Sequence, residues 1–284
     1  MAELINGKEV SAAVRVGIAA EVAKLKAEYN VVPGLAVVVV GDDPASAIYV
    51  RNKHRACLEV GINSLEYRFS ADVSEDEVLD KIRELNNDDS VHGILVQLPL
   101  PKHISEKKII ESIAPHKDVD AFHPENVGRI MLGEPIFLPC TPAGIMELLS
   151  YYKIDIRGKE CVVIGRSNIV GKPMSLLLTA KDGTVTMCHS KTADLVEHTR
   201  RADIVVVAIG RAEFLTGDMI KDGAIVIDVG INRTSDGRVV GDVKFDDVSA
   251  RASMITPVPG GVGPMTITML LKNTLTAAKL GFEK

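Results

Sequence analysis

A short stretch near the middle of the chain, residues 161–173 (Cys-Val-Val-Ile-Gly-Arg-Ser-Asn-Ile-Val-Gly-Lys-Pro), constrains the fold more than any other. Its apolar start predicts a buried parallel strand, and its glycines predict a tight turn that leads into a helix. Such a unit directs backbone N–H groups and the positive end of a helix dipole at one point, which suits a phosphate. The alternative is a purely structural turn, because Ser167 stands where the G-x-G-x-x-G fingerprint of dinucleotide sites has its second glycine.

The residues that follow favour one dinucleotide over another. A second strand is predicted at residues 184–188, and residues 183–193 contain no carboxylate. An NAD site usually places an acid there to bind the ribose 2′-hydroxyl. Instead, the strand leads into His189-Ser190-Lys191-Thr192, and Arg166 lies in the first turn together with Gly165. A guanidinium and a hydroxyl match a 2′-phosphate, which a carboxylate would repel, so we expect NADP rather than NAD.

Strand and helix patterns alternate along the whole chain. The continuous apolar runs at 35–40 and 93–97 are typical of parallel strands, and Ser74-Glu75-Asp76-Glu77 is a capping box that predicts a helix start. Residues 118–140 carry little periodicity and are interpreted as a crossing loop. We therefore predict an α/β protein of two domains with mainly parallel sheets around a cleft. The predicted domains are residues 1–140 plus 265–284, and a Rossmann-like nucleotide-binding domain at 141–264.

Composition excludes several classes of function. With 284 residues and 46% hydrophobic content, the chain can bury two ordinary cores. Its net charge of −5 gives no electrostatic footprint for nucleic acid or for a membrane surface. The start lacks the pattern of a secretory signal and no apolar run approaches a membrane span, so we expect a cytoplasmic protein. The histidines are scattered, which predicts no metal site, and the four widely spaced cysteines predict reduced thiols.

Side chains that follow two strands of the first domain are candidates for chemistry. Gln97 ends one strand, and Tyr49 and Lys53 lie one turn apart on the helix that follows another, so all three can face one crevice. A solvated helix face is the simpler interpretation of the Tyr–Lys pair. The functional one is a lysine, partly desolvated beside a phenol, whose lowered pKa permits proton exchange near neutrality. Asp120 is either a turn-capping aspartate or an anchor for two adjacent N–H donors of a ring.

Seven stretches carry a recognisable pattern in order along nearly the whole chain. They are Tyr49-Val50-Arg51-Asn52-Lys53, Gln97-Leu98-Pro99-Leu100-Pro101, Asp118-Val119-Asp120, Pro139-Cys140-Thr141-Pro142, residues 165–173, His189-Ser190-Lys191-Thr192, and residues 257–266. Together they resemble one family, the bifunctional methylenetetrahydrofolate dehydrogenase/methenyltetrahydrofolate cyclohydrolases of the FolD type. In one place the sequence departs from the family pattern: Ala121 follows Asp-Val-Asp, where the family usually has glycine.

The resemblance implies two reactions in one cleft: NADP-dependent oxidation of 5,10-methylenetetrahydrofolate to the methenyl cation, then hydrolysis to 10-formyltetrahydrofolate. It implies that Lys53 is the acid–base group, that Gln97 orients it, that Tyr49 stacks on the folate and that Asp120 anchors the pterin. It also implies a homodimer. The further contacts that it implies are Leu98, Pro259, Gly260, Gly261, Val262 and Gly263 for the substrate, and Gly165, Arg166, Ser167, Ser190 and Ile231 for NADP.

Two other functions remain open at this point. A two-domain NADP-dependent dehydrogenase of another small molecule would reduce or oxidise that molecule without turning over folate. A binding protein that senses NADP would bind the nucleotide and catalyse nothing. A short-chain dehydrogenase, which also has a Tyr-x-x-x-Lys pair, is disfavoured because Tyr49 and Lys53 precede the nucleotide turn at Gly165 instead of following it.

Overall fold

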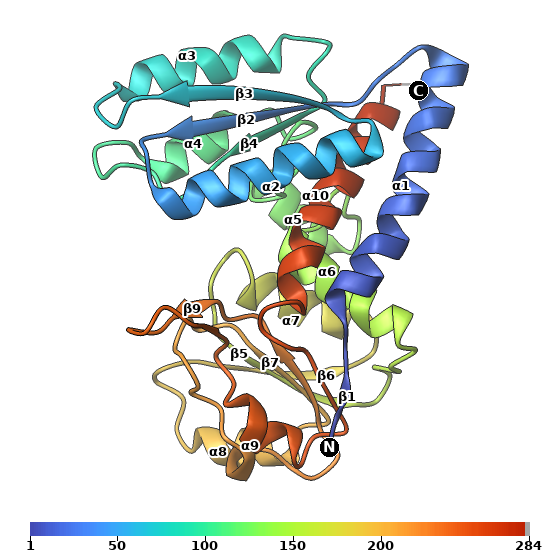
Figure 1. Ribbon diagram of the computed structural model, residues 1–284, viewed down its shortest axis with the longest axis vertical. Helices are drawn as coiled ribbons and strands as arrows, with labels where there is room; N and C mark the ends of the chain where they lie inside the picture. Colours follow the sequence, from blue (N-terminus) through green and yellow to red (C-terminus); the bar gives the residue numbers. More distant parts are fainter. Residues whose placement is uncertain (282–284) are drawn as a thin grey trace. The chain divides into compact units, whose positions relative to one another are not determined.

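The computed structural model describes residues 1–281, apart from the side chains of residues 44–46. The chain forms two compact units, which are coloured by sequence in Figure 1. Unit 1 comprises Met1–Ala12 and Pro139–Thr266, and unit 2 comprises Ala13–Leu138 and the chain from Ile267 onward. Compared with the sequence-based division, residues 1–12 lie in the unit formed by the later part of the chain, and each of the other two boundaries is shifted by two residues.

Unit 2 is a small parallel sheet covered by helices on both faces. Its strands have the order β3-β2-β4, and both pairings are parallel. The strands are β2 (Gly34–Val40), β3 (Asn63–Phe69) and β4 (Gly93–Val96). The helices wholly within the unit are α2 (Pro44–Val60), α3 (Glu75–Asn86), α4 (Glu106–Ser112) and α5 (Pro124–Leu132). The helices α1 (Gly7–Tyr29) and α10 (Val262–Lys279) each have residues in both units.

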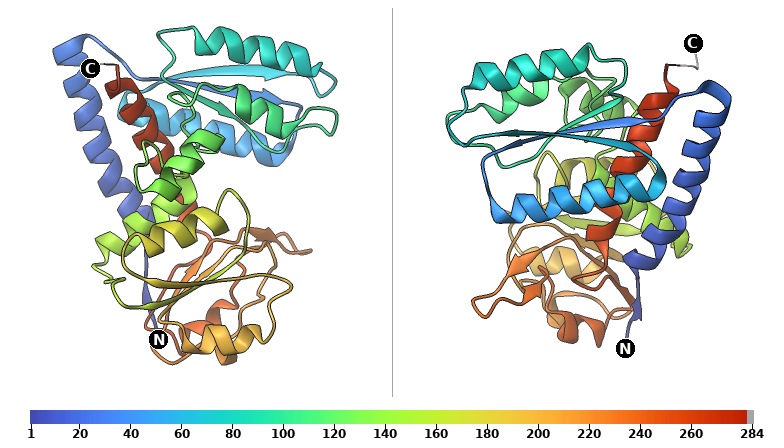
Figure 2. Two further views of the ribbon diagram at one scale, coloured as in Figure 1. Left: turned by 180° about the vertical axis from the view of Figure 1, so that it is seen from behind. Right: turned by 45° about the horizontal axis from the view of Figure 1, so that its top comes forward.

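The alternation of the strand residues explains this layering. Every residue of β2 is buried, as expected for a central strand with helices on both faces. Ala36, Val38 and Val40 point to one face and pack with buried residues of α3 and α4, while Figure 2 shows α2 on the opposite face. The predicted capping box is present at the start of α3: the Ser74 hydroxyl accepts the Glu77 N–H, and the Glu77 carboxylate accepts the Ser74 N–H.

The interpretation of residues 118–140 as a crossing loop was wrong, because α5 lies within them. Pro124 occupies the first turn of this helix, where its missing N–H costs nothing, and the His123 side chain accepts the Glu125 N–H. Gly133 ends the helix with φ +78°, a left-handed conformation that glycine adopts without strain. A proline start and a glycine stop are therefore present, but a helix of nine residues is too short to show a clear period.

Unit 1 is a larger, fully parallel sheet with the strand order β1-β11-β8-β7-β5-β6. Its strands are β1 (Glu3–Leu4), β5 (Glu160–Ile164), β6 (Thr184–Cys188), β7 (Ile204–Val207), β8 (Ile225–Asp228) and β11 (Met254–Ile255). The helices are α6 (Cys140–Tyr151), α7 (Gly171–Thr179), α8 (Leu195–Arg201), α9 (Phe245–Ser249) and the 3₁₀ turn η1 (Gly217–Met219). The strands β9 (Asn232–Arg233) and β10 (Val239–Val240) pair antiparallel as a short hairpin.

Two features at the ends of unit 1 were not anticipated. The first is β1, which adds an edge strand by pairing Glu3 with Met254. The second is the start of α6: the helix begins at Cys140, and the hydroxyl of Thr141 in its first turn lies 3.0 Å from the Thr266 hydroxyl. Pro139 stands at the N-cap, and its side chain makes no capping bond.

All four cysteines are buried and free, and burial raises the pKa of the Cys57 and Cys161 thiols to about 11, so these two stay protonated near neutrality. Among residues 1–281, no group of three or more His, Cys, Asp or Glu side chains is placed to hold a metal ion. In the same range, no helix is long and apolar enough to cross a membrane.

Candidate active site

In unit 2, a lysine and a glutamine meet at the carboxyl edge of the sheet. Gln97 follows β4 directly, and its N–H donates to the Val38 carbonyl at 2.8 Å, which continues the ladder between β2 and β4. The Lys53 ammonium on α2 donates to Gln97 Oε1 at 3.0 Å, and Gln97 Nε2 donates to the Leu98 carbonyl at 2.7 Å. The second bond turns the amide oxygen toward the lysine. Both side chains are half-buried, so the pair combines a fixed geometry with access from outside.

Asp120 lies in the turn that follows a single bridge to β4. Ile94 of β4 forms a parallel bridge with Asp118, and the chain then turns, with the Ala121 N–H donating to the Asp118 carbonyl at 3.1 Å. The loop is held from inside, because the buried Asp118 carboxylate accepts the His123 N–H at 2.8 Å and Asn126 Nδ2 at 2.9 Å. Asp120 itself is half-buried.

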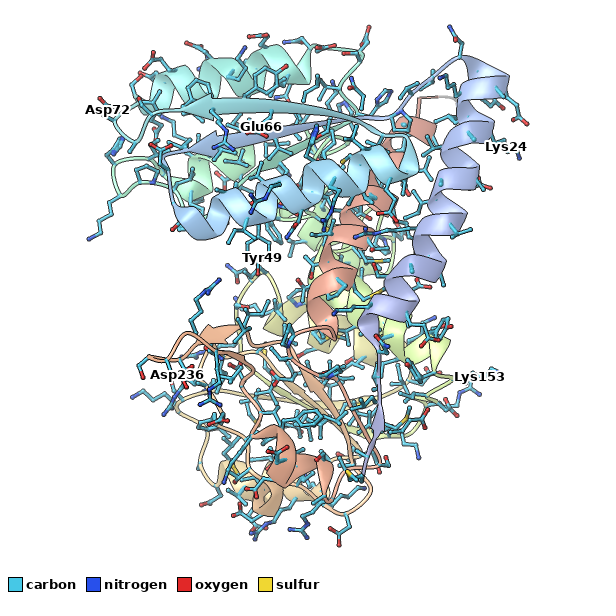
Figure 3. The ribbon with its side chains drawn as sticks, viewed as in Figure 1. Lys24, Tyr49, Glu66, Asp72, Lys153 and Asp236 are labelled. Atoms are coloured by element: carbon cyan, nitrogen blue, oxygen red, sulfur yellow. The ribbon has the colours of Figure 1, made fainter. Side chains whose placement is uncertain are left out.

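Tyr49 lies one helical turn before Lys53 and is 41% exposed. Figure 3 labels Tyr49, whose ring projects from α2 on the side away from β3. An exposed ring one turn from a half-buried amine offers a flat surface beside a proton-carrying group. This arrangement suits a planar ligand that has a reacting atom near the lysine.

In unit 1, the turn after β5 depends on a glycine. Gly165 has φ +132°, and a Cβ built there would lie 2.4 Å from the Ala208 carbonyl oxygen, so no other residue fits. Ser167, which stands in place of the second fingerprint glycine, has a structural role: its hydroxyl accepts the N–H groups of Val170 at 3.1 Å and Gly171 at 3.3 Å. The hydroxyl thus satisfies two N–H groups at the start of α7 that the standard motif leaves for a phosphate.

The loop after β6 presents Ser190. The His189 N–H donates to Thr192 Oγ1 at 2.8 Å, and the Thr192 N–H donates back to the His189 carbonyl at 2.9 Å. The Lys191 N–H donates to His189 Nδ1 at 3.2 Å. This closed turn needs only local residues, which is why His-Ser-Lys-Thr acts as a unit. It leaves the Ser190 side chain exposed.

These two loops line one cavity of about 300 Å³, together with the loop after β7. None of its lining residues is a carboxylate, and the positively charged ones are Arg166 and Arg211. A phosphate-bearing nucleotide end fits this composition, as the sequence predicted from Arg166 and Ser190. Of the predicted NADP contacts, Gly165, Arg166 and Ser190 line the cavity, whereas Ser167 and Ile231 are not among its lining residues. The lining residues are Ile164, Gly165, Arg166, His189, Ser190, Leu195, Ala208, Ile209, Arg211 and Phe214.

The turn before α10 carries the remaining predicted contacts. Gly260 has φ +111°, and a Cβ at Gly261 would lie 2.6 Å from the Pro257 carbonyl oxygen, so internal packing alone requires both glycines. Val262 is 3% exposed and opens α10, which leaves Pro259 as the exposed side chain of the turn. Ile231 is 52% exposed, and its Cδ1 atom lies 3.7 Å from where a Cβ at Gly263 would stand.

Two buried carboxylates of unit 1, which the sequence analysis missed, bind the backbone of the loops at the carboxyl edge of its sheet. Asp228 ends β8, and its oxygens accept the N–H groups of Gly230, Asp242 and Val243 at 2.9–3.0 Å. Asp242 accepts the N–H groups of Ile209, Gly210 and Arg211 at 2.7–2.9 Å, and Asn232 Nδ2 at 2.9 Å. Burial raises the pKa of Asp228 to about 6. The signal that the sequence offered for this role was the position of Asp228 at the end of an apolar strand.

Comparison with known proteins gives the chain full-length relatives. A family model described as "Tetrahydrofolate dehydrogenase/cyclohydrolase, catalytic domain" matches residues 5–120, and one described as "Tetrahydrofolate dehydrogenase/cyclohydrolase, NAD(P)-binding domain" matches residues 139–282. "Bifunctional protein FolD" of Acetivibrio thermocellus is 59% identical over 279 residues, which cover 98% of each chain.

Solved structures agree with these matches. The bifunctional FolD enzyme of Campylobacter jejuni superposes with a TM-score of 0.97 at 52% identity, covering 99% of this chain and 100% of that one. The Trypanosoma brucei methylenetetrahydrofolate dehydrogenase-cyclohydrolase, solved in complex with NADP cofactor and an inhibitor, has a TM-score of 0.96 at 41% identity. That superposition covers 100% of this chain and 99% of the other.

Proposed function

Because the chain belongs to the tetrahydrofolate dehydrogenase/cyclohydrolase family, we propose that it catalyses both reactions of that family, with NADP as the cofactor. It oxidises 5,10-methylenetetrahydrofolate to 5,10-methenyltetrahydrofolate and then hydrolyses the product to 10-formyltetrahydrofolate. In this proposal unit 2 provides the reacting groups for folate and unit 1 binds the nucleotide.

The observation that carries the proposal is the bond from Lys53 Nζ to Gln97 Oε1. Hydrolysis of the methenyl cation requires both protons of the attacking water to leave its oxygen, and one of them to reach the ring nitrogen as the bond from that nitrogen to the carbon breaks. A primary amine held at a fixed place by an amide can carry both transfers in turn, with the surplus proton passing to solvent. Tyr49 then supports the folate ring system, and Asp120 anchors the pterin through two adjacent N–H donors.

The oxidation places a different demand on the protein. When bound, NADP⁺ supplies the acceptor for the hydride, and no proton has to be removed from the substrate carbon. The task of the chain is therefore to hold two ligands in one orientation. Arg166 and Ser190 suit the 2′-phosphate, and the Gly165 turn lets the backbone approach the nucleotide. Leu98, Pro259, Gly260, Gly261, Val262 and Gly263 are proposed to contact the substrate, and Ser167 and Ile231 to contact NADP.

A cytoplasmic homodimer completes the proposal. It is supported by the family resemblance and by a net charge of −5, which favours neither nucleic acid nor membrane surfaces. Light scattering on the purified chain tests the dimer, for which twice the chain mass of 30.6 kDa is expected.

The experiment that tests the proposed function follows three signals in one mixture. Purified protein receives 5,10-methylenetetrahydrofolate with either NADP⁺ or NAD⁺, and the reduced cofactor, the methenyl absorbance and the formyl product are recorded together. NADP-dependent reduction with catalysed appearance of the formyl product is expected. If the methenyl species accumulates and is hydrolysed only at the uncatalysed rate, the cyclohydrolase activity is excluded. Failure to reduce either cofactor would instead favour a different dehydrogenase or an NADP-sensing binding protein.

A further inference from the structure

The cavity of unit 1 receives cationic side chains from two separate loops. Arg166 comes from the turn after β5, and Arg211 from the loop after β7. Ser190 comes from the loop after β6, the strand next to β5 in the sheet. Sequence analysis anticipated Arg166 and Ser190 and gave no signal for Arg211. The presence of Arg211 in this cavity is therefore not explained by the sequence motifs.

The backbone that carries Arg211 is rigidly held. Its N–H donates to Asp242 Oδ1 at 2.8 Å, and the preceding N–H groups of Ile209 and Gly210 donate to Asp242 Oδ2 at 2.7 and 2.9 Å. Asp242 is 0% exposed, so these three charge-assisted bonds are shielded from water. A loop tied down at three consecutive residues presents its next side chain from a fixed point.

The guanidinium itself is held from one side. Its central carbon lies 4.9 Å from the centroid of the Phe214 ring, a cation–π contact that covers one face and leaves the N–H edge available. Within residues 1–281, neither Arg211 nor Arg166 forms an ion pair with a carboxylate. Two guanidinium groups without counter-ions, in a cavity without acidic lining residues, provide a net positive site.

We propose that Arg211 is a specificity-determining residue that binds the 2′-phosphate of NADP as a second cation beside Arg166. The inference rests on the proposed function, because it concerns the same cofactor. A 2′-phosphate carries up to two negative charges near neutrality, and one guanidinium balances only one of them. NAD has a hydroxyl at this position, so Arg211 favours NADP selectively and does not merely strengthen nucleotide binding.

A surface arginine that only packs on Phe214 is the competing explanation. It predicts that removing the charge weakens every adenosine ligand equally or weakens none. The two explanations therefore differ in selectivity, which can be measured without any folate. The probes are 2′,5′-ADP and 5′-AMP, which carry the adenosine ends of NADP and NAD.

Titration calorimetry of both probes with the full chain tests the inference. For Arg211→Met we expect 2′,5′-ADP binding to weaken about 10- to 100-fold, and 5′-AMP binding to change by less than about 3-fold. Arg211→Lys keeps the charge and should lose about 3- to 10-fold for 2′,5′-ADP. The matched control is Arg157→Met, an exposed arginine of the same unit that pairs with Asp182 away from the cavity. Its binding of both probes should match that of the unchanged chain.

Each contrary outcome has a distinct meaning. If the unchanged chain prefers 2′,5′-ADP and Arg211→Met keeps that preference, the inference fails while NADP stands. If Arg211→Met loses both probes equally, a selective role for the charge is excluded. If the unchanged chain binds 2′,5′-ADP no more tightly than 5′-AMP, the assignment of NADP as the cofactor is wrong. The inference about Arg211 is then wrong as well, because it depends on that assignment. Repeating the titrations in 1 M salt adds a check, because screening should shrink the difference between Arg211→Met and the unchanged chain.

Discussion

Each of the two units has its candidate ligand-binding groups at the carboxyl edge of a parallel sheet, yet the two units hold those groups in different ways. In unit 2 the central feature is a bond between two side chains, Lys53 and Gln97, and the amide is oriented by its own neighbour, Leu98. In unit 1 the loops themselves are held, by the Gly165 turn and by the buried carboxylates of Asp228 and Asp242. Chemistry that moves protons depends on which atoms a side chain carries. Binding a large nucleotide depends on the shape of the backbone.

This contrast predicts that changes in unit 2 affect rate more than stability, and that the reverse holds in unit 1. The largest effect is expected for Lys53→Met. Loss of the acid–base group should slow methenyl hydrolysis between about 10² and 10⁴-fold, with the unfolding free energy nearly unchanged. Stopped-flow absorbance of the methenyl species measures the rate. Lys24→Met, an exposed lysine on α1, is the control and should behave like the unchanged chain. If Lys53→Met hydrolyses the methenyl species at the rate of the unchanged chain, Lys53 is not the acid–base group.

Gly165→Ala tests the other half of the comparison. The added Cβ would stand 2.4 Å from a carbonyl oxygen at a backbone angle that only glycine adopts easily. Strain and overpacking together should cost about 2 to 5 kcal/mol of unfolding free energy and weaken NADP binding. Gly158→Ala is the matched control, because Gly158 also has positive φ, at +68°, but has nothing within 4 Å of the new Cβ. Its cost should be about 1 kcal/mol. Equal costs in urea denaturation would show that the close contact relaxes freely.

The buried carboxylate of Asp228 makes the stability of unit 1 depend on pH. The folded pKa of Asp228, about 6, lies above its unfolded value of about 4, so the folded state binds the proton more tightly. Stability is therefore greatest below about pH 4 as far as this group is concerned, and falls as pH rises to about 6. The loss is up to about 3 kcal/mol for two pH units.

Urea denaturation of the unchanged chain and of Asp228→Asn between pH 4 and pH 7 measures this contribution. The variant starts from a lower stability, because its amide nitrogen meets the Val243 N–H that a carboxylate oxygen accepted. It should lack the decrease between pH 4 and pH 6. An identical decrease in both proteins would assign the pH dependence to other groups.

The smallest effect concerns Ala121, where the family usually has glycine. Its φ of +59° strains an alanine by about 1–2 kcal/mol, which Ala121→Gly would relieve. The buried methyl contributes about 0.8 kcal/mol, and glycine adds unfolded-state entropy of about 0.5–1 kcal/mol. These terms nearly cancel, so the change in unfolding free energy should stay below about 1 kcal/mol. A larger change in thermal or urea denaturation would mean that the loop before α5 carries more strain than its backbone angle indicates.

Most of the fold was predictable because its signals are local. The apolar run of β2, the capping box of α3 and the glycine turn after β5 each lie within a few consecutive residues. The strand β1 was missed because two exposed residues have no recognisable pattern, and its partner lies at the other end of the chain. The helix α5 was missed because its nine residues are too few to show a period, although Pro124 and Gly133 mark both of its ends.

The residues of the candidate site were likewise predictable where their signals are local. Lys53, Gln97, Arg166 and Ser190 lie in short sequence motifs that could be recognised. The role of Asp242 could not, because its donors lie about thirty residues earlier, at Ile209, Gly210 and Arg211. A buried acid that serves backbone N–H groups has no fixed spacing to them, since only the folded sheet brings the two loops together.

The pairing of β1 with β11 also affects how the protein can be made. Glu3 leaves the ribosome long before its partner Met254, whereas β2, β3 and β4 are synthesised within one short segment. The small sheet can therefore form while translation continues, but one edge of the large sheet stays open until the chain is almost finished. An open strand edge attracts other chains. We therefore expect unit 1 to depend on a chaperone during synthesis more than unit 2 does.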